Sequence, residues 1–275
     1  MQLRLAKLQV KPKRKERNKY TDLGISTDLM IQIKMNKDQN LKGYTLLEAF
    51  PGVGLVGAMS GSYIIEKLGM EIIGRIDSDY FPPLSAVHDS VPMFPARIYK
   101  SKDLKLVLVM SEFAIPPNLS YALTQELLSF ARKYGISRIA SVGGLPVNKP
   151  SDKIYIISSD SGMNDSAKKL GIIPIKDGII AGISASLLNY SADLGIPTFD
   201  ILVEVNPAIT DPKYAELAIT GLNKLMNMKI DLEELDKEAK LVETKVKDLL
   251  KKLKEHQDQM GNGSPPPPPD QSMYA

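Results

Sequence analysis

One glycine-rich turn has the spacing of a dinucleotide-binding motif. Gly52, Gly54 and Gly57 match the pattern G-x-G-x-x-G, after a strand-like run and before a stretch with helical spacing. Asp77 lies 25 residues after Gly52, at the end of the next strand-like run. In nucleotide-binding enzymes such glycines let the backbone approach a pyrophosphate, and such an acid binds a ribose hydroxyl. Pro51 and the small residues that follow the motif favour a structural interpretation, in which the glycines make a tight turn and let a helix pack closely on a sheet.

Few other residues offer catalytic chemistry. The chain has no Cys and two His, which excludes thiolate metal sites, iron–sulfur clusters and multi-histidine metal sites. His88 lies in a polar loop without a G-x-S-x-G motif, so we expect a non-catalytic His. Glu112, Asp160 and Asp165 follow strand-like runs, which places them either along a ligand cleft or in ordinary surface loops. No set of residues defines a reaction, and we predict no catalytic residue, no metal and no cofactor.

The elements that would position these residues alternate between strand and helix over residues 30–228. This alternation predicts an α/β fold, with a mostly parallel sheet flanked by helices on both faces. The expected strands are Tyr44–Phe50, Glu71–Asp77, Arg97–Tyr99, Leu104–Met110, Arg138–Val142 (ending at Gly143 and Gly144), Lys153–Ser158 and Phe199–Val205. The expected helices are Leu55–Leu68, Ser120–Tyr134, Asn164–Leu170, Gly182–Leu194 and Pro212–Leu225.

Composition and charge describe the class of protein. Of the 275 residues, 43% are hydrophobic and 24% charged, as in globular proteins. The net charge is +3, but residues 1–20 carry eight basic side chains and one acidic one. The rest of the chain therefore has a slight excess of acidic side chains. We expect residues 1–29 to be a disordered basic extension, with nucleic-acid binding as the alternative. No apolar run is long enough for a membrane span and no signal-peptide pattern is present, so we predict a cytoplasmic protein.

A heptad pattern follows the α/β body, in residues 229–260. The seam positions are separated by alternating steps of three and four, which is typical of a coiled coil. The seam runs from Leu232 to Met260, which is 29 residues. A helix of this length would extend roughly 43 Å at about 1.5 Å per residue, so we expect it to join copies of the chain or to fold back on the body. The predicted oligomerisation residues are Leu232, Leu235, Val242, Val246, Leu249 and Leu253.

Residues 261–275 combine a joint, a spacer and an aromatic terminus. Gly261–Ser264 predicts a flexible joint, and Pro265–Pro269 a stiff spacer of roughly 15 Å at about 3.1 Å per residue. Met273, Tyr274 and Ala275 then form a hydrophobic–tyrosine–any-residue tripeptide. An apolar side chain, an aromatic ring and a free carboxylate can be held by a pocket with a cation and backbone donors. The segment therefore predicts a tethered docking peptide.

The chain resembles the proteasome assembly chaperone family, in its archaeal branch. The residues that carry the resemblance are Glu48–Gly57 (EAFPGVGLVG), Phe81-Pro82-Pro83, Ser141–Pro146 (SVGGLP) and the terminal Met273–Ala275. The resemblance covers about residues 41–228 and implies a phosphorylase-like α/β fold without enzymatic activity. It also implies a structural role for Gly52, Gly54, Gly57, Gly143 and Gly144.

The resemblance further implies partners. It suggests a homo-oligomer that presents several tails to pockets between the α subunits of the 20S proteasome, where Ala275 would pair with a lysine and Tyr274 would pack nearby. Some members of the family pair with one another, so a paralogous partner is an alternative. The absence of a G-x-x-x-x-G-K-[ST] motif makes any activation independent of ATP.

Two classes of function therefore remain from the sequence. The first is a homo-oligomeric assembly chaperone or activator that docks its tails on the proteasome. The second is a nucleotide- or small-molecule-binding enzyme on the same body, and a cage-forming scaffold is a further alternative.

Overall fold

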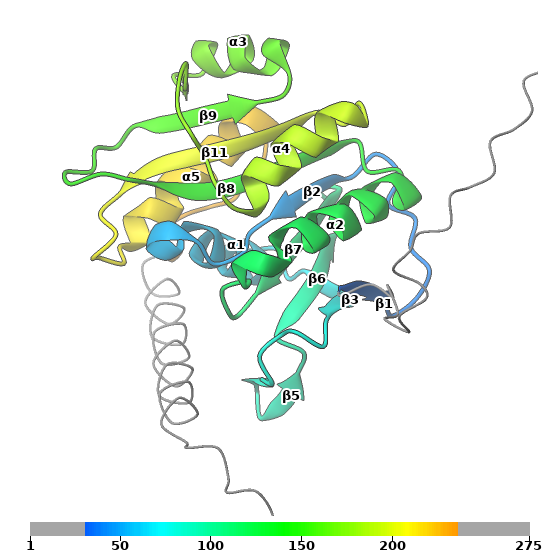
Figure 1. The fold of residues 1–275 in the computed structure, drawn as a ribbon. Coiled ribbons are helices and arrows are strands. Elements are labelled where there is room, and N and C mark those ends of the chain that lie inside the picture. Colours follow the sequence, from blue (N-terminus) through cyan, green and yellow to red (C-terminus); the bar gives the residue numbers. More distant parts are fainter. Residues whose placement is uncertain (1–30, 236–275) are drawn as a thin grey trace, which may run out of the picture.

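The computed structural model describes residues 31–235, which form one α/β unit around a nine-stranded sheet (Figure 1). The strands follow the order β1 (Gln32–Met35), β3 (Glu71–Asp77), β6 (Ala96–Ser101), β7 (Leu106–Ser111), β2 (Thr45–Glu48), β8 (Arg138–Pro146), β11 (Thr198–Val205), β9 (Ile154–Ser158) and β10 (Ile173–Pro174). Strands β7, β2, β8 and β11 are mutually parallel. The predicted α/β class is confirmed. The sheet is mixed because β1, β3 and β6 pair antiparallel with their neighbours and β9 pairs antiparallel with β11.

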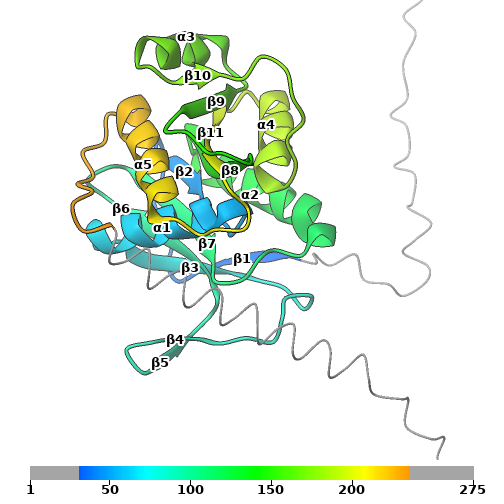
Figure 2. The ribbon, with the colours of Figure 1, turned by 90° about the vertical axis from the view of Figure 1, so that its left-hand side faces the viewer.

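Helices cover both faces of the sheet (Figure 2). On one face, α1 (Val56–Lys67) and α5 (Pro212–Met226) pack on the sheet, with α3 (Ser161–Lys169) over β9 and β10. The opposite face is covered by α2 (Ser120–Tyr134) and α4 (Ile183–Asp193), with the short helix η3 (Pro117–Leu119) leading into α2. The sheet thus separates two hydrophobic layers, as expected for strands that are apolar on both sides.

Local sequence signals account for several element boundaries. The predicted helix Ser120–Tyr134 coincides with α2, which ends at Gly135 in a left-handed conformation with φ of 68°. Helix α5 begins after Asp211, whose side chain accepts a hydrogen bond from the backbone N–H of Lys213. Glycine past the last turn and a carboxylate before the first are the expected signals for helix ends.

Most other predicted boundaries differ from the structure by one or more residues, and three of the differences have a clear local cause. The strand expected to end at Gly143 and Gly144 continues through both glycines to Pro146, because both pair with β11. The helix expected at Leu55–Leu68 starts one residue later. Leu55, the last residue of the short helix η2 (Val53–Leu55), adopts a left-handed φ of 55° and so cannot belong to α1. The helix expected at Asn164–Leu170 is α3, which begins earlier because Asp160 caps it by accepting from Gly162.

A small hairpin arm projects from the body between β3 and β6 (Figure 2). Its strands are β4 (Ala86–His88) and β5 (Val91–Met93), which pair antiparallel. The two turn residues, Asp89 and Ser90, both have positive φ, at 50° and 66°. Two consecutive left-handed residues are typical of a type I′ turn, which matches the twist of a two-residue hairpin. The described helices include none that is long and apolar enough to cross a membrane.

Candidate functional site

The glycine-rich turn joins the end of β2 to α1 at the carboxyl edge of the parallel strands. A Cβ at Gly57 would lie 2.4 Å from the carbonyl oxygen of Phe50, and a Cβ at Gly144 of β8 would lie 2.4 Å from that of Val53. Gly54 has a φ of 67°, and a Cβ there would lie 3.0 Å from the side chain of Val205. Only glycine permits these approaches, which pack the turn against β8 and β11.

The other two predicted structural glycines have more room. A Cβ at Gly52 would meet no atom within 4 Å, and a Cβ at Gly143 would lie 3.2 Å from the side chain of Leu202. The steric demand of the motif therefore falls on three glycines out of the five, and Gly52 is the position that distinguishes a packing role from a ligand-binding role.

The structure does not bring Asp77 to the glycine-rich turn. Strand β3, which ends at Asp77, is separated from β2 by β6 and β7. With a spacing of about 4.8 Å between neighbouring strands, the two strands are roughly 14 Å apart. Asp77 instead lies 2.7 Å from Lys34, and a hydrogen bond from this ammonium group lowers the pKa of the carboxyl. The arrangement differs from a dinucleotide site, in which the acid follows the strand next to the glycine-rich turn.

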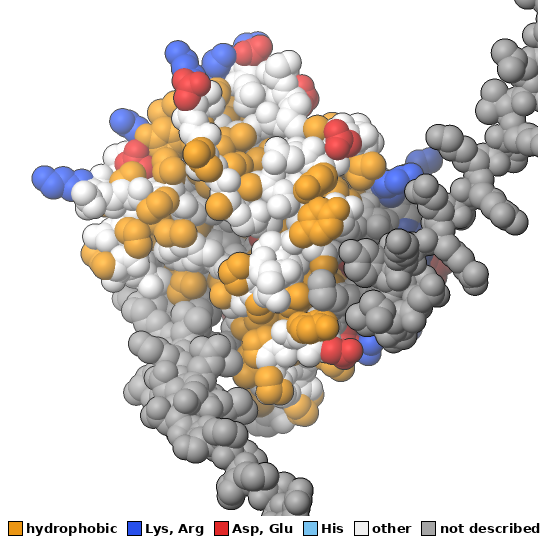
Figure 3. Space-filling view, viewed as in Figure 1, with side chains coloured by type: hydrophobic (Ala, Val, Ile, Leu, Met, Phe, Trp, Pro, Cys, Tyr) orange, Lys and Arg blue, Asp and Glu red, His pale blue; other side chains and the backbone are white. Residues whose placement is uncertain are grey.

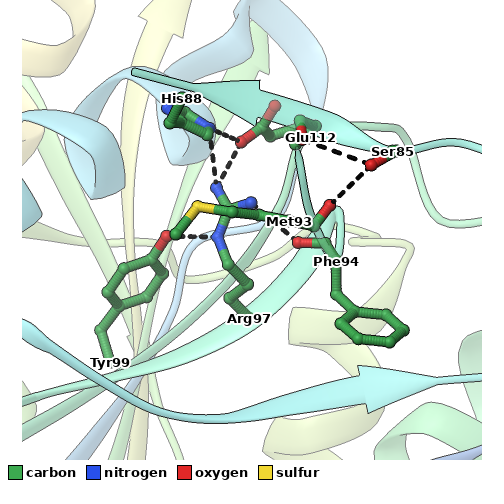
Figure 4. A network of polar contacts seen from close by, with 8 residues as sticks. Ser85, His88, Met93, Phe94, Arg97, Tyr99 and Glu112 are labelled. Carbon is green, nitrogen blue, oxygen red and sulfur yellow. Dashed lines mark hydrogen bonds and ion pairs between the residues drawn. The ribbon is translucent and has the colours of Figure 1, made fainter. Parts of the chain in front are cut away.

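A charged network connects the hairpin arm to the sheet (Figure 4). Glu112 follows β7, and its Oε1 lies 2.5 Å from His88 Nε2 on the arm and also accepts a hydrogen bond from Arg97 Nη2 of β6. Arg97 further donates to the carbonyl of Phe94 at 2.8 Å and to the hydroxyl of Tyr99 at 2.5 Å. The Arg97 side chain is 5% exposed, so this guanidinium is a buried charge whose partners all lie near the base of the arm.

The electrostatics of the network favour an ionised Glu112. Burial alone would raise the pKa of Glu112, but the Arg97 guanidinium and the hydrogen bond from His88 hold the pKa below its usual value. The nearest polar hydroxyl of the arm, Ser85, donates to the carbonyls of Ala86 and Met93 and makes no contact with His88. The described contacts therefore fix the arm, and they do not assemble a nucleophile with a base.

The acids that follow β9 do not join Glu112 in a cleft, so this alternative from the sequence is wrong. Strand β9 runs antiparallel to β11, and its end at Ser158 pairs with the start of β11 at Phe199. Its carboxyl end therefore lies at the opposite edge of the sheet from Glu112. Asp160 caps α3, and Asp165 forms an exposed ion pair with Lys168 at 3.0 Å.

The arm also carries exposed apolar side chains. Val87 and Val91 on the hairpin are 62% and 54% exposed, and Tyr80 and Phe94 at its base are 60% and 50% exposed. Figure 3 shows apolar side chains gathered at the projecting end of the molecule where β5 lies in Figure 1. Sequence reasoning placed His88 and Glu112 in separate loops and missed Arg97, although a charged residue in an apolar strand is a readable signal.

The structure describes only the first part of the heptad segment. Leu235 is 2% exposed and belongs to the hydrophobic layer beneath α1 and α5, and Leu232 packs against the same layer. Tyr63 of α1 donates to the carbonyl of Asp231 at 2.6 Å, which fixes the chain at the far end of α1. The other predicted oligomerisation and docking residues lie outside the described residues: Val242, Val246, Leu249, Leu253, Met273, Tyr274 and Ala275.

Within residues 31–235 no cluster of three or more His, Asp or Glu side chains could hold a metal ion. Sequence reasoning also missed Asp200, a buried carboxyl of β11, and did not assign a role to Glu48 at the end of β2. Their signal was a carboxylate within an apolar strand, and their geometry is described below.

Comparisons with known proteins identify one family model. The model of the PAC2 family matches residues 46–250. Among curated proteins, the uncharacterized protein MJ0106 of Methanocaldococcus jannaschii is 29% identical over 205 residues, which covers 74% of this chain and 84% of that protein. A second protein of the same organism, MJ1210, is 25% identical over 250 residues and covers 88% of this chain and 95% of its own length.

Solved structures share the fold. The crystal structure of Pyrococcus furiosus PbaA, described as an archaeal homolog of proteasome-assembly chaperone, superposes with a TM-score of 0.74 at 24% identity and covers 82% of this chain and 99% of its own. P. furiosus PbaB, described as an archaeal proteasome activator, gives 0.67 at 22% identity over 82% of this chain and 99% of its own. A Thermoplasma acidophilum protein of unknown function gives 0.75 at 26% identity over 81% and 92%.

Proposed function

This chain belongs to the PAC2 family, and we propose that it is a homo-oligomeric, ATP-independent proteasome assembly chaperone or activator. Two proteins that share its fold are described as an archaeal homolog of proteasome-assembly chaperone and as an archaeal proteasome activator. The observation that carries the proposal is the combination of the family match over the body with a hydrophobic–tyrosine–any-residue tripeptide in the same sequence. We place its action in the cytoplasm.

The proposed docking residues are Met273, Tyr274 and Ala275, and their partners are the α subunits of the 20S proteasome. In this proposal the ring of Tyr274 packs in a pocket between adjacent α subunits, and the carboxylate of Ala275 pairs with a lysine. The Pro265–Pro269 spacer keeps the tripeptide away from the body. Several tails on one oligomer would bind with avidity, because each bound tail raises the effective concentration of the others.

Self-association is assigned to the heptad positions Val242, Val246, Leu249 and Leu253, because Leu232 and Leu235 pack against the core of the body itself. The burial of Leu235 fixes the last described residue of the chain on the body. A paralogous family member is a second candidate partner for the same seam.

We propose no enzymatic activity for the body. His88, the one histidine among the described residues, contacts Glu112 and Arg97 and no hydroxyl nucleophile. The glycine-rich turn is packed against β8 and β11, which supports a structural role for the motif.

The deciding experiment measures 20S peptidase activity and direct pull-down with three proteins. These are the full chain, a variant lacking Met273–Ala275, and Ser272→Ala as a matched control for a change in the same segment. We expect binding to disappear with the tripeptide and to persist in the control. Loss of stimulation together with binding would assign an activator, and binding without stimulation an assembly chaperone. Equal binding by the variant without the tripeptide would refute tail docking.

A second measurement addresses assembly. The chain should be shortened after Leu235 rather than earlier, because Ile230 and Leu235 belong to the hydrophobic core of the body. Light scattering is expected to give a smaller mass for the shortened chain than for the full chain. An unchanged mass would show that the body alone determines the oligomeric state.

A further inference from the structure

Two carboxyl groups lie in the interior of the sheet in a single row. Glu48, at the end of β2, is 5% exposed, and Asp200, in β11, is 1% exposed. Both pair in register with Ser141 of β8, the strand between them. Residues in register on neighbouring strands point to the same face of a sheet and lie about 4.8 Å apart from strand to strand. The three side chains therefore form a carboxyl–hydroxyl–carboxyl row, here called the acid row.

The acid row faces the layer that α2 and α4 cover. Ser184, in the first turn of α4, makes a hydrogen bond to Asp200. Ile183 and Leu187 of the same helix are buried in this layer. The amino-terminal turns of α4 thus close the acid row from the solvent.

The polar partners of the acid row are few. Glu48 Oε1 accepts a hydrogen bond from the backbone N–H of Phe50 at 2.9 Å. Asp200 Oδ1 is fully buried and has no hydrogen-bond partner among the described residues, and the Ser141 hydroxyl lies beside Glu48 and lowers the pKa of that carboxyl. One carboxyl oxygen of the row, Asp200 Oδ1, is therefore unpaired.

Among residues 31–235, no cation offsets the charge of the two carboxyls. The charged groups on the elements packed around the row are Glu126, Arg132 and Lys133 of α2, Asp193 of α4, Arg138 of β8, Lys153 just before β9, and Glu204 of β11. None of these acts on either carboxyl: the electrostatic neighbour of Asp200 is Glu48 itself. Glu126 is bound instead to the backbone N–H of Ile33 at 2.9 Å, and Glu204 to Tyr155 at 2.6 Å.

The consequence is a raised proton affinity. Burial raises the pKa of Glu48 to about 7. Burial, together with the charge of Glu48, raises the pKa of Asp200 to about 8. An apolar layer disfavours the charged form of a carboxyl, and a second carboxylate nearby disfavours it further.

We infer that Glu48, Ser141 and Asp200 form a proton-binding site that couples pH to the seating of α4 on the sheet. While the row holds its protons, a protonated carboxyl can donate a hydrogen bond to a free oxygen of the row. When both protons are lost, two like charges remain in the layer beneath α4, and the helix is loosened. This inference is independent of the proposed function, because it concerns the body alone.

The sign of the effect follows from linkage. Both folded pKa values lie above the ordinary values of 4.5 and 3.8, so the folded state binds more protons than the unfolded state between those limits. The stability that the row contributes is therefore fully present below about pH 4. It is lost, and the free energy of unfolding falls, as pH rises towards about 8. Each additional proton held by the folded state changes the unfolding equilibrium constant about tenfold per pH unit.

The first test measures the two carboxyls directly in the full chain, by ¹³C NMR of labelled Asp and Glu side chains between pH 4 and 9. Two resonances are expected to titrate above pH 6, and the higher one is expected to disappear in Asp200→Asn. Titration of every Asp and Glu below pH 5.5 would overturn the proton-binding site.

The second test measures its coupling to α4. Urea unfolding of the full chain is expected to show an unfolding constant that rises at least tenfold between pH 5.5 and 7.5, and a weaker rise in Asp200→Asn or Glu48→Gln. Glu204→Gln is the matched control, because this carboxyl is on the same strand but has a lowered pKa. Hydrogen exchange in α4 should accelerate with pH relative to α5, which packs on the opposite face. Equal pH slopes in wild type and Asp200→Asn, or equal changes in α4 and α5, would refute the coupling.

Discussion

A pair of alanine substitutions within the glycine-rich turn separates packing from ligand binding. In Gly57→Ala, the new Cβ would lie 2.4 Å from the Phe50 carbonyl oxygen and 3.3 Å from that of Val142. Both contacts are with backbone atoms, so the strand or the helix must shift. Gly52→Ala is the matched control, since a Cβ there meets no atom within 4 Å and the backbone is extended, with a φ of −136°.

The magnitude follows from two opposing effects at Gly57. Overpacking a well-filled interior costs about 1–3 kcal/mol and occasionally more. Alanine in place of glycine within a helix contributes about 1 kcal/mol in the opposite direction. Because both overlaps are with backbone atoms, the upper part of the overpacking range applies, about 3 kcal/mol. We therefore expect a net loss of about 2 kcal/mol, which lowers the melting temperature of a body this size by roughly 4–8 °C. Gly52→Ala should change stability by no more than about 0.5–1 kcal/mol, with a slight gain because the unfolded chain loses freedom.

Urea unfolding of both variants, followed by far-UV circular dichroism, measures these differences. Equilibrium binding of NAD and nucleoside phosphates to the same proteins provides the second readout. Equal stability of Gly57→Ala and wild type would refute the packing explanation of the motif. Nucleotide binding by the wild type that Gly52→Ala abolishes would instead support the dinucleotide interpretation.

Three further predictions concern the ion pairs and the tail. Arg97→Met should lower the free energy of unfolding by about 2–4 kcal/mol in urea titrations, because Glu112 loses the charge that compensates its burial. Lys34→Met should lower it by less than about 1 kcal/mol, because the pair of Lys34 with Asp77 is more exposed to solvent. In acid, the lowered pKa of Glu112 means that its stabilisation is present above its unfolded pKa and is lost as pH falls through the folded value, so Glu112→Gln should flatten the pH dependence of unfolding below about pH 5. Tyr274→Ala should abolish docking on the proteasome while light scattering gives an unchanged oligomer mass, and a changed mass would show that the tail takes part in assembly.

Local signals predicted the elements well where the chain itself determines them. The strand Glu71–Asp77 and the helix Ser120–Tyr134 match the structure to the residue. Both have clear alternation or helical periodicity, and the helix is followed by a glycine that ends it. The glycine-rich turn was also readable, because a dense set of glycines between a strand and a helix indicates a close backbone approach whatever its purpose.

Long-range pairing explains what the sequence could not predict. The hairpin of β6 and β7 lies between β3 and β2, so that consecutive strands along the chain are not neighbours in the sheet. The direction of β9 depends on its pairing with β11, some forty residues later, and neither strand contains a signal for it. Both features decide which acids share an edge. The contact between Glu112 and His88 likewise depends on where the arm folds back. The two strands of the arm have three residues each, too few to show a periodic pattern in the sequence.

The position of the buried acids was half visible in the sequence. Asp200 lies between Phe199 and Ile201 in the mostly apolar strand Thr198–Val205, which marks it as unusual. Alternation alone does not reveal whether the second face of a strand is covered, so a carboxyl in a strand reads as solvent-facing by default. The presence of α4 over that face makes Asp200 a buried group, and only the register through Ser141 places it beside Glu48.

The carboxyl edge of the parallel strands is where α/β proteins bind small ligands, and such a site needs open space beside the strand ends. In this body Val205 fills the space at Gly54, and the carbonyl of Val53 lies against Gly144, so side chains and backbone of the protein itself occupy the turn. Glu112, which follows β7 at this edge, accepts a hydrogen bond from Arg97 and contacts His88 of the arm. Glycines and acids at this edge contact ligands in other proteins of this fold class, and here they make contacts within the body. The exposed apolar side chains of the arm are, among the described residues, available for recognition. A projecting arm with exposed apolar side chains is suited to contact with a large partner, and this physical argument supports the proposal of a chaperone or activator over that of an enzyme.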